Sequence, residues 1–311
     1  MKETLNIVNI AGKLVKKSFD IVDVDVKDEK GNVVGKDKAI RGTLTLRTDD
    51  GSEHDVNYYS RMTKKDGNPN QNYKALETVN NEYKTMEKFP EDYDHVQIGF
   101  GQFNVNDYKG QDGTIKTYNN LRATFANRMD LKQIETTPLE AKFEIEGIVE
   151  SIQEELYKDE PTGNYRVKVN VIGYNDTIIP VNLVVLKETV EPFSQAGFFE
   201  GGYAKFTGKL VNTTETETVV EKMAFGEDNV KTITKTVSRF ELLGGNPMGT
   251  PYEHDVDPSE YEQAKSKRKL KLDELLKAEN KPKQQSSNPF GSSTGNSQPS
   301  TNANPFANPF A

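Results

Sequence analysis

The chain has 311 residues, a length typical of two domains, and only 34% of them are hydrophobic, so we expect part of it to be unfolded. It contains no cysteine, which excludes disulfides, thiolate metal sites and cysteine nucleophiles and is typical of a reducing cytosol. The net charge of −8 excludes a uniformly basic protein, but it is distributed unevenly, with −1 over residues 1–137, −7 over 138–250 and zero over 251–311.

No targeting or membrane segment is predicted. The first six residues hold no basic stretch followed by an apolar one, and the longest apolar run, Ile178–Leu186, is interrupted by Pro180 and Asn182. We therefore expect a cytoplasmic protein without a membrane partner.

Residues 1–137 predict a first β-rich domain. Its opening strand pattern, over residues 5–26, contains Gly12 as a bend, and Thr48-Asp49-Asp50-Gly51-Ser52 has the composition of a hairpin turn. Apolar residues at helical spacing predict an amphipathic helix over Asn72–Lys88. Further strands are expected at Ile40–Arg47, Glu53–Met62, Val96–Val105 and Lys116–Phe125. Three strands, a helix and two strands are the order of the OB-fold, a five-stranded Greek-key barrel.

Residues 138–250 run through the same order of elements without repeating the residues themselves. Gly147 takes the place of Gly12 in the first strand. The expected elements are strands at Phe143–Val149, Tyr165–Ile172, Thr177–Leu186, Tyr203–Thr213 and Ile233–Leu242, with a short helical stretch at Lys187–Ala196. We predict a mainly β fold with two OB-fold-like five-stranded barrels in tandem. The alternative is that two β-rich segments look alike at this level without sharing a topology.

The remainder of the chain predicts a helix and a disordered tail. Asp257-Pro258-Ser259-Glu260 has the features of a helix start, so we expect a helical segment within residues 251–280. Its basic run, Lys265–Lys271, would either contact phosphate or remain solvated. Residues 281–311 are rich in Ser, Asn, Gln, Pro and Gly. They cannot bury enough apolar surface to offset the entropy of ordering, so a disordered tail is predicted.

Catalytic patterns are missing from the sequence. The three histidines, His54, His95 and His254, lie in different segments and have no metal-ligand spacing. No phosphate-binding loop or nucleophile elbow occurs. Gly99-Phe100-Gly101 lies within an expected strand and therefore indicates a bulge or a close approach of backbone or ligand. We predict a non-enzymatic protein without a cofactor or metal, and a nuclease or glycan hydrolase that uses clustered acids is the disfavoured alternative.

Strand periodicity predicts a binding surface on the first domain. Alternation places the aliphatic side chains of three strands on one face and their basic and aromatic side chains on the other. The outer set is Arg41, Arg47, Tyr59, Arg61 and Arg122, and Lys64, Lys65, Tyr73 and Lys74 continue it beyond the third strand. Aromatic rings and guanidinium planes on such a face stack on unpaired bases while cations follow the phosphates. The alternative is an ordinary solvated sheet on which Arg and Tyr pair across strands.

The second domain offers a similar alternation with Arg166 and Lys168 on one face and valines on the other. Its charge of −7 opposes a polyanion except in a local groove, so a structural or protein-binding role for this domain is an alternative of at least equal weight.

The chain resembles the single-stranded DNA-binding proteins of bacteriophages that infect Gram-positive bacteria. The resemblance is carried by Asn6-Ile7-Val8-Asn9-Ile10-Ala11-Gly12-Lys13-Leu14, by Tyr58-Tyr59-Ser60-Arg61, and by a tail that ends near Pro309-Phe310. It implies a protein of the host bacterial cytoplasm that coats single-stranded DNA without sequence specificity during replication or recombination. The chain departs from the pattern because its tail has no acidic cluster before Pro-Phe and ends in Ala311. It also has no tryptophan, so Tyr and Phe would do the stacking.

The tail repeats the tripeptide Asn-Pro-Phe three times. Phenylalanine anchors that follow a stiff proline are ordered at little entropic cost, and repetition raises their effective concentration at a partner. We predict that replication or recombination proteins dock on Pro289, Phe290, Pro305, Phe306, Pro309 and Phe310. The competing hypothesis is a protein–protein adaptor or scaffold that acts through this tail alone. Oligomeric state, DNA site size, DNA or RNA preference, and whether both barrels bind all stay open.

Overall fold

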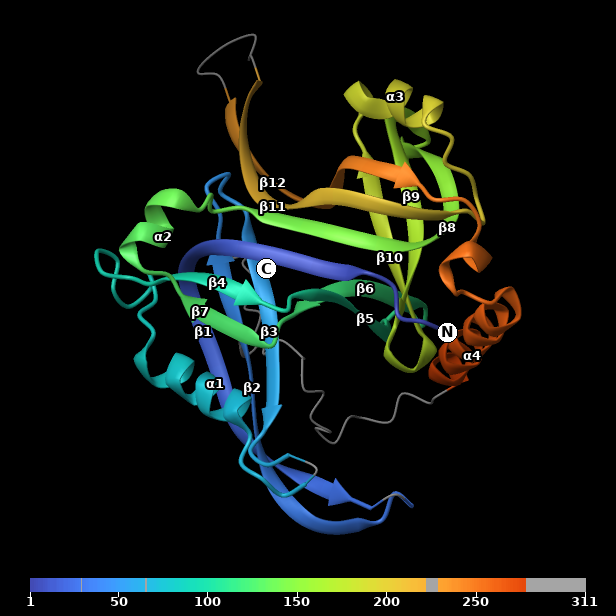
Figure 1. Ribbon diagram of the computed structural model, residues 1–311. Helices are drawn as coiled ribbons and strands as arrows, with labels where there is room; N and C mark the ends of the chain where they lie inside the picture. Colours follow the sequence, from blue (N-terminus) through green and yellow to red (C-terminus); the bar gives the residue numbers. More distant parts are fainter. Residues whose placement is uncertain (29, 65, 222–228, 278–311) are drawn as a thin grey trace, which may run out of the picture.

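The computed structural model describes residues 1–277 with the exception of residues 29, 65 and 222–228, and the side chains of residues 215–221 and 229–235 also lie outside the description. Within these limits the chain forms two β-barrels and a helix that follows them (Figure 1).

The first barrel closes in the order expected for an OB-fold. Its elements are β1 (Asn6–Lys27), β2 (Val33–Arg47), β3 (Glu53–Arg61), α1 (Gln71–Glu82), β4 (His95–Gly99), β5 (Gln102–Lys109), β6 (Ile115–Arg122) and β7 (Phe125–Arg128). β2 pairs with β1 and β3, and β3 pairs in parallel with β6. The predicted fourth and fifth strands are each divided, so that β5 pairs with β6 while β4 pairs with β7 and with β1. The pairing of β4 with β1 closes the barrel.

The second barrel repeats this topology. After the short helix α2 (Leu131–Thr136), its elements are β8 (Ala141–Tyr157), β9 (Glu160–Gly173), β10 (Thr177–Val185), α3 (Val190–Gln195), β11 (Tyr203–Glu221) and β12 (Asn229–Pro247). β9 pairs with β8 and β10, β10 pairs in parallel with β12, and β11 pairs with β12 and β8. The predicted mainly β fold with two tandem five-stranded barrels is thereby confirmed.

Equivalent glycines explain why both barrels can close. A Cβ on Gly12 would lie 2.8 Å from the carbonyl oxygen of Arg47, and one on Gly147 would lie 2.4 Å from that of Asn170. Neither contact leaves room for a side chain, so glycine is required where the first strand crosses closely over the second. The two barrels therefore share a packing constraint as well as an order of strands.

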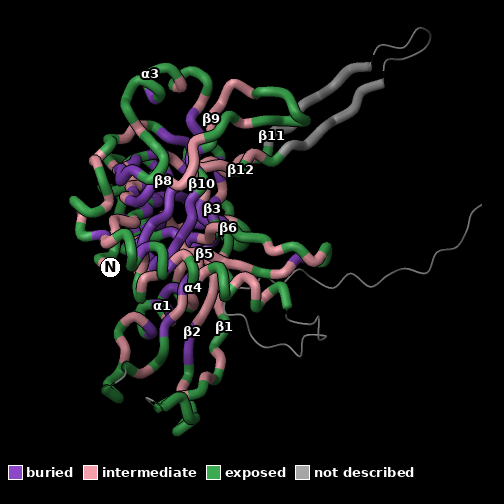
Figure 2. The backbone as a smooth tube through the Cα atoms, turned by 90° about the vertical axis from the view of Figure 1, so that its right-hand side faces the viewer, coloured by how far each residue is buried: buried purple, intermediate pink, exposed green. Residues whose placement is uncertain are grey.

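The barrels are joined by hydrogen bonds and by a common core. Residues Asn6–Ile10 of β1 pair with Ala141–Ile145 of β8, which makes one continuous sheet of the two barrels. Phe103 of the first barrel packs against Phe143 and Phe240 of the second, with ring centroids 5.6 and 4.8 Å away. Buried segments accordingly run through the centre of the molecule (Figure 2), while the β1–β2 and β11–β12 hairpins project from it (Figure 1).

Helix α4 (Pro258–Lys277) packs on both barrels. Its Tyr261 and Ala264 lie in a small apolar cluster with Ile172 and Ile178 of the second barrel. Farther along, the Arg268 guanidinium lies 2.7 Å from the Asp107 carboxylate on β5 of the first barrel. One residue of the expected basic run is thus used to hold the helix in place. No helix among the described residues is long and apolar enough to cross a membrane.

Helix α1 is shorter than predicted. It ends at Glu82 because Tyr83 adopts extended backbone angles and the ammonium of Lys17 donates to the carbonyl oxygens of Val79, Asn80 and Tyr83 at 2.6–3.0 Å. A cation at the carbonyl end of a helix satisfies groups that would otherwise lack a partner and also favours the helix dipole. The apolar residues that follow, which extended the predicted pattern to Lys88, belong to an irregular segment.

Candidate nucleic-acid interface

The strand register brings the predicted surface residues of β2 and β3 onto one face. Val56 and Tyr58 are buried, and the residues that alternate with them face outward. Arg41 lies opposite Tyr59, and Arg47 lies opposite Glu53. Arg61 continues the outer row of β3, and Arg122 of β6 lies opposite Asn57. We call this surface, made by the outward residues of β1, β2, β3 and β6, the outer face.

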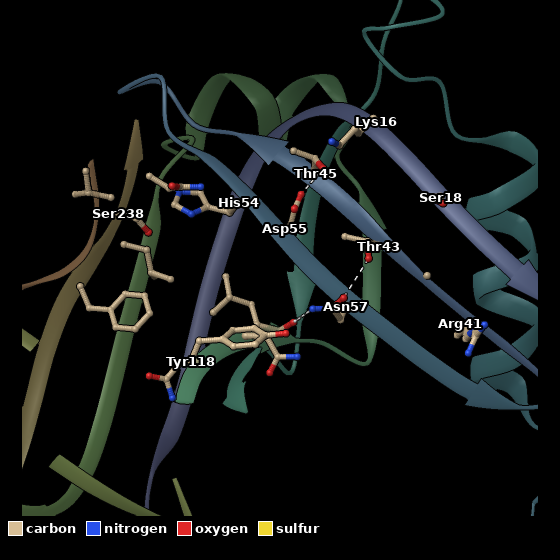
Figure 3. A pocket seen from close by; sticks show the side chains of 18 of the residues that line it. Lys16, Ser18, Arg41, Thr43, Thr45, His54, Asp55, Asn57, Tyr118 and Ser238 are labelled. Atoms are coloured by element: carbon tan, nitrogen blue, oxygen red, sulfur yellow. Dashed lines mark hydrogen bonds between the residues drawn. The ribbon is translucent and has the colours of Figure 1, made fainter. Parts of the chain in front are cut away.

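A groove runs along the outer face where the two barrels meet. It encloses a volume of about 610 Å³ between the first barrel and the β11–β12 hairpin. Figure 3 shows Arg41 at one end and His54 and Ser238 at the other. The lining residues are Lys16, Ser18, Asp20, Arg41, Gly42, Thr43, Thr45, His54, Asp55, Asn57, Tyr118, Asn119, Asn120, Leu121, Leu210, Val211, Asn212, Ser238 and Phe240.

Hydrogen bonds fix the polar wall of the groove. The Thr43 hydroxyl donates to the Asn57 amide oxygen at 3.1 Å, and the Asn57 amide nitrogen donates to the Leu121 carbonyl at the same distance (Figure 3). The Thr45 hydroxyl donates to the Asp55 carboxylate at 2.5 Å. These side chains are therefore held in place before any ligand arrives.

Three cations of the outer face have side chains that make no hydrogen bond or ion pair with any residue that the structure describes. They are Lys16, Arg41 and Arg122. Arg61 donates only to the backbone carbonyl of Asp25, at 3.3 Å. Arg47 differs, because its guanidinium binds the Glu53 carboxylate at 2.5 Å. Two acids share this face: Asp20 is the cross-strand partner of Arg41, and Asp55 lines the groove together with Lys16, so the face is only moderately positive.

Aromatic rings on the outer face come from two strands, and of the two tyrosines only Tyr118 lines the groove. Tyr59 is half-buried beside Arg41, as predicted from its strand. Tyr118 on β6 is 43% exposed, lines the groove and packs edge-on against Tyr108, with ring centroids 5.8 Å apart. The Asn106 amide donates to its hydroxyl and fixes the ring. Tyr118 was not predicted from the sequence, although it continues the alternation of Asn120 and Arg122 by two residues.

Several predicted residues lie elsewhere. The prediction for Tyr73 is corrected, because this side chain is only 3% exposed and faces the core beneath α1, where a ligand does not reach it. Lys64 and Lys74 are exposed on the loop after β3 and on α1, outside the groove lining. Lys65 and the tail residues Pro289, Phe290, Pro305, Phe306, Pro309 and Phe310 lie outside the described residues.

His54 is the buried titratable group of the groove. It is 3% exposed, and burial lowers the pKa of its imidazole from 6.5 to about 4, with Asp50 and Asp55 opposing the shift only in part. The ring is therefore neutral near pH 7. Among the described residues no group of three or more His, Asp or Glu side chains could hold a metal ion.

The corresponding strands of the second barrel carry cations that are neutralised. Arg166 lies 2.6 Å from Glu155 and Lys168 lies 3.0 Å from Glu150. On β11 and β12, Lys205, Lys209 and Arg239 are likewise ion-paired with glutamates. Helix α4 covers this surface near the turn between β9 and β10, where its Tyr261 accepts a hydrogen bond from the buried Asn170. The two barrels thus have the same fold and different surface chemistry.

Comparisons with known proteins give structural and family matches. A crystal structure of a deletion mutant of the single-stranded DNA binding protein from Thermus aquaticus is 14% identical, with 80% of this chain and 96% of that chain covered at a TM-score of 0.41. A replication protein A heterotrimer bound to single-stranded DNA is 13% identical, with 89% and 54% covered at a TM-score of 0.18. No curated protein matches. The YorF family model matches residues 6–278, and the chain therefore belongs to the YorF family.

Proposed function

We propose that the protein binds single-stranded DNA along the outer face of its first barrel. The observation that carries this proposal is the presence of three unneutralised cations, Lys16, Arg41 and Arg122, on the same surface as the rings of Tyr59 and Tyr118. Cations follow the phosphates, and each base that stacks on an aromatic ring contributes about 1–3 kcal/mol. Recognition of ring faces and phosphates does not depend on sequence.

The groove favours an unpaired strand because its polar wall and its rings must reach the bases. Its walls come from two barrels that share a sheet and a core, so they are preorganised and little entropy is lost in forming the site. With three free cations, log K is expected to fall against log salt with a slope of about −2, at about 0.7 per phosphate contact on a single strand.

We further propose that this is a bacteriophage protein that coats single-stranded DNA during replication or recombination. Its Asn-Pro-Phe tail would recruit partner proteins to the coated strand through Pro289, Phe290, Pro305, Phe306, Pro309 and Phe310.

An adaptor that does not bind DNA is the second candidate. It is favoured by the net charge of −7 over residues 138–250 and by the ion-paired cations of the second barrel. An adaptor would need the tail and would not need the free cations of the first barrel.

Fluorescence anisotropy with labelled oligo-dT at two salt concentrations tests the proposal. Binding that weakens with salt and exceeds duplex binding is expected, and the Arg41→Gln, Arg122→Gln double variant should weaken it. The matched control is Arg166→Gln, Lys168→Gln, which removes the same charge from ion pairs of the second barrel and should leave affinity unchanged. Absence of binding at low salt would leave the adaptor as the explanation. Removal of residues 281–311 should preserve DNA affinity and abolish partner capture.

A further inference from the structure

Phe100 occupies an unfavourable backbone position and is exposed. It lies at the bulge between β4 and β5 with a φ of +53°, in the left-handed region, and 77% of its surface faces solvent. Glycine and, less often, asparagine adopt this conformation readily, whereas a bulky residue there is an outlier. Such positions concentrate at functional sites, where the surrounding structure maintains the strained conformation.

The backbone of the bulge is needed, but the phenyl ring is not needed to form it. The Val8 amide donates to the Gly101 carbonyl at 2.7 Å, and a Cβ on Gly101 would lie 2.2 Å from the Val8 carbonyl oxygen. The close approach expected for Gly99-Phe100-Gly101 is confirmed. The Thr124 amide donates to the Gly99 carbonyl at 3.1 Å and holds the other side. A glycine at position 100 would satisfy the same geometry with less strain.

The ring is only partly supported by the protein. Its centroid lies 5.7 Å from that of Phe125, at an interplanar angle of 57°. This contact sets the direction of the Phe100 ring and leaves most of its surface in water. The neighbouring polar groups include the Asn127 amide, which lies 3.5 Å from the Cβ position of Gly99.

The register connects Phe100 to the outer face. Gln102, two residues beyond Phe100, lies opposite Arg122, and Arg122 lies opposite Asn57 of the groove wall. A strand that leaves the groove past Asn57 therefore meets the free guanidinium of Arg122 and then the bulge. The surroundings combine the Phe125 ring with amides and a cation, a mixture that suits a base and its phosphate.

We propose that Phe100 is a stacking platform for a nucleobase at the end of the groove, with Arg122 holding the adjoining phosphate. This rests on the proposed function and extends the DNA path around the first barrel. The strained backbone directs the ring into solvent, where a base can cover it.

The Phe100→Gly variant separates the ring from the backbone. Because glycine accepts the positive φ, the resistance of the Phe100→Gly protein to urea should equal or exceed that of the wild type. Its affinity for oligo-dT should fall at least about fivefold, as expected for the loss of one stacked base. Phe100→Tyr keeps a ring and should retain affinity. Tyr174→Ala, which removes a ring with 73% exposure from the second barrel, is the matched control and should change nothing.

The outcomes distinguish this inference from the proposed function. If the wild type binds oligo-dT and Phe100→Gly binds it equally well, the platform is refuted and the DNA-binding function stands. If the wild type does not bind, both fail. A direct measurement uses oligo-dT with 5-iododeoxyuridine substitutions, photocross-linking and mass spectrometry. A cross-link at Phe100 supports the platform, and cross-links confined to other residues overturn it.

Discussion

Acid should destabilise the protein through His54, and the size of the effect can be worked out. The pKa of the imidazole is about 4 in the folded protein and 6.5 when unfolded. Between these values the unfolded chain binds a proton that the folded protein does not, so stability falls as the pH decreases through this window. The loss from this one group is negligible above pH 7 and reaches about 3 kcal/mol at pH 4.

The His54→Gln variant isolates this contribution, because glutamine is neutral at every pH and has a similar size. Urea unfolding of both proteins should be measured at pH 7, 6, 5 and 4. Carboxylates titrate in the same range in both proteins, so the informative quantity is the difference between the two free energies of unfolding. From pH 7 to pH 4 the free energy of unfolding of the wild type should fall by about 3 kcal/mol more than that of the variant. A difference that stays constant with pH would refute the burial argument for His54.

Three further perturbations have expected outcomes. Lys17→Met should lower the free energy of unfolding by about 1–3 kcal/mol, measured in urea, because three carbonyls at the end of α1 lose a charged donor; an unchanged midpoint would count against this cap. Arg268→Met should cost about 3 kcal/mol, because the carboxylate of Asp107, which is 4% exposed, loses its cationic partner and keeps the uncharged Thr117 hydroxyl as a donor, and amide exchange in α4 should accelerate. Arg41→Gln and Arg122→Gln should each reduce the slope of log K against log salt by about 0.7, and a slope that does not change would place the phosphates elsewhere.

Alternation along β2 and β3 was sufficient to predict their outward residues, because a half-buried strand repeats every two residues. The prediction was wrong for Tyr73 on α1, which was assigned to the binding surface but is buried. The N-cap at Asn70 starts α1 so that Tyr73, Leu76 and Val79 point inward together, a spacing of three that the sequence contains. Residues three apart share a helix face wherever the helix begins, so the spacing from Tyr73 to Leu76 placed Tyr73 in the core rather than on the binding surface.

Pairing between the barrels could not be predicted from the sequence. Residues 6–10 have the same strand pattern whether they pair within the first barrel or with β8, more than 130 residues away. The neutralisation of Arg166 and Lys168 was also invisible, because their partners Glu155 and Glu150 lie on β8, where bulges shift the register. Charge counted along the sequence therefore identified the acidic domain but not the individual cations that remain free.

The different roles proposed for the two barrels follow from where the free cations lie. Each of the two strand cations on the second barrel's equivalent face is bound to a carboxylate, and the turn end of that face is occupied by α4. The side chain of Asn119, on the β6 strand of the first barrel, donates to the Pro180 carbonyl of β10 and covers a further part. If the first barrel binds DNA as proposed, the second barrel serves to build one wall of the groove and to hold it rigid. Ion pairing leaves its strand cations unavailable to phosphates, and its excess of seven acids over residues 138–250 repels them, so the DNA path is expected to follow the first barrel.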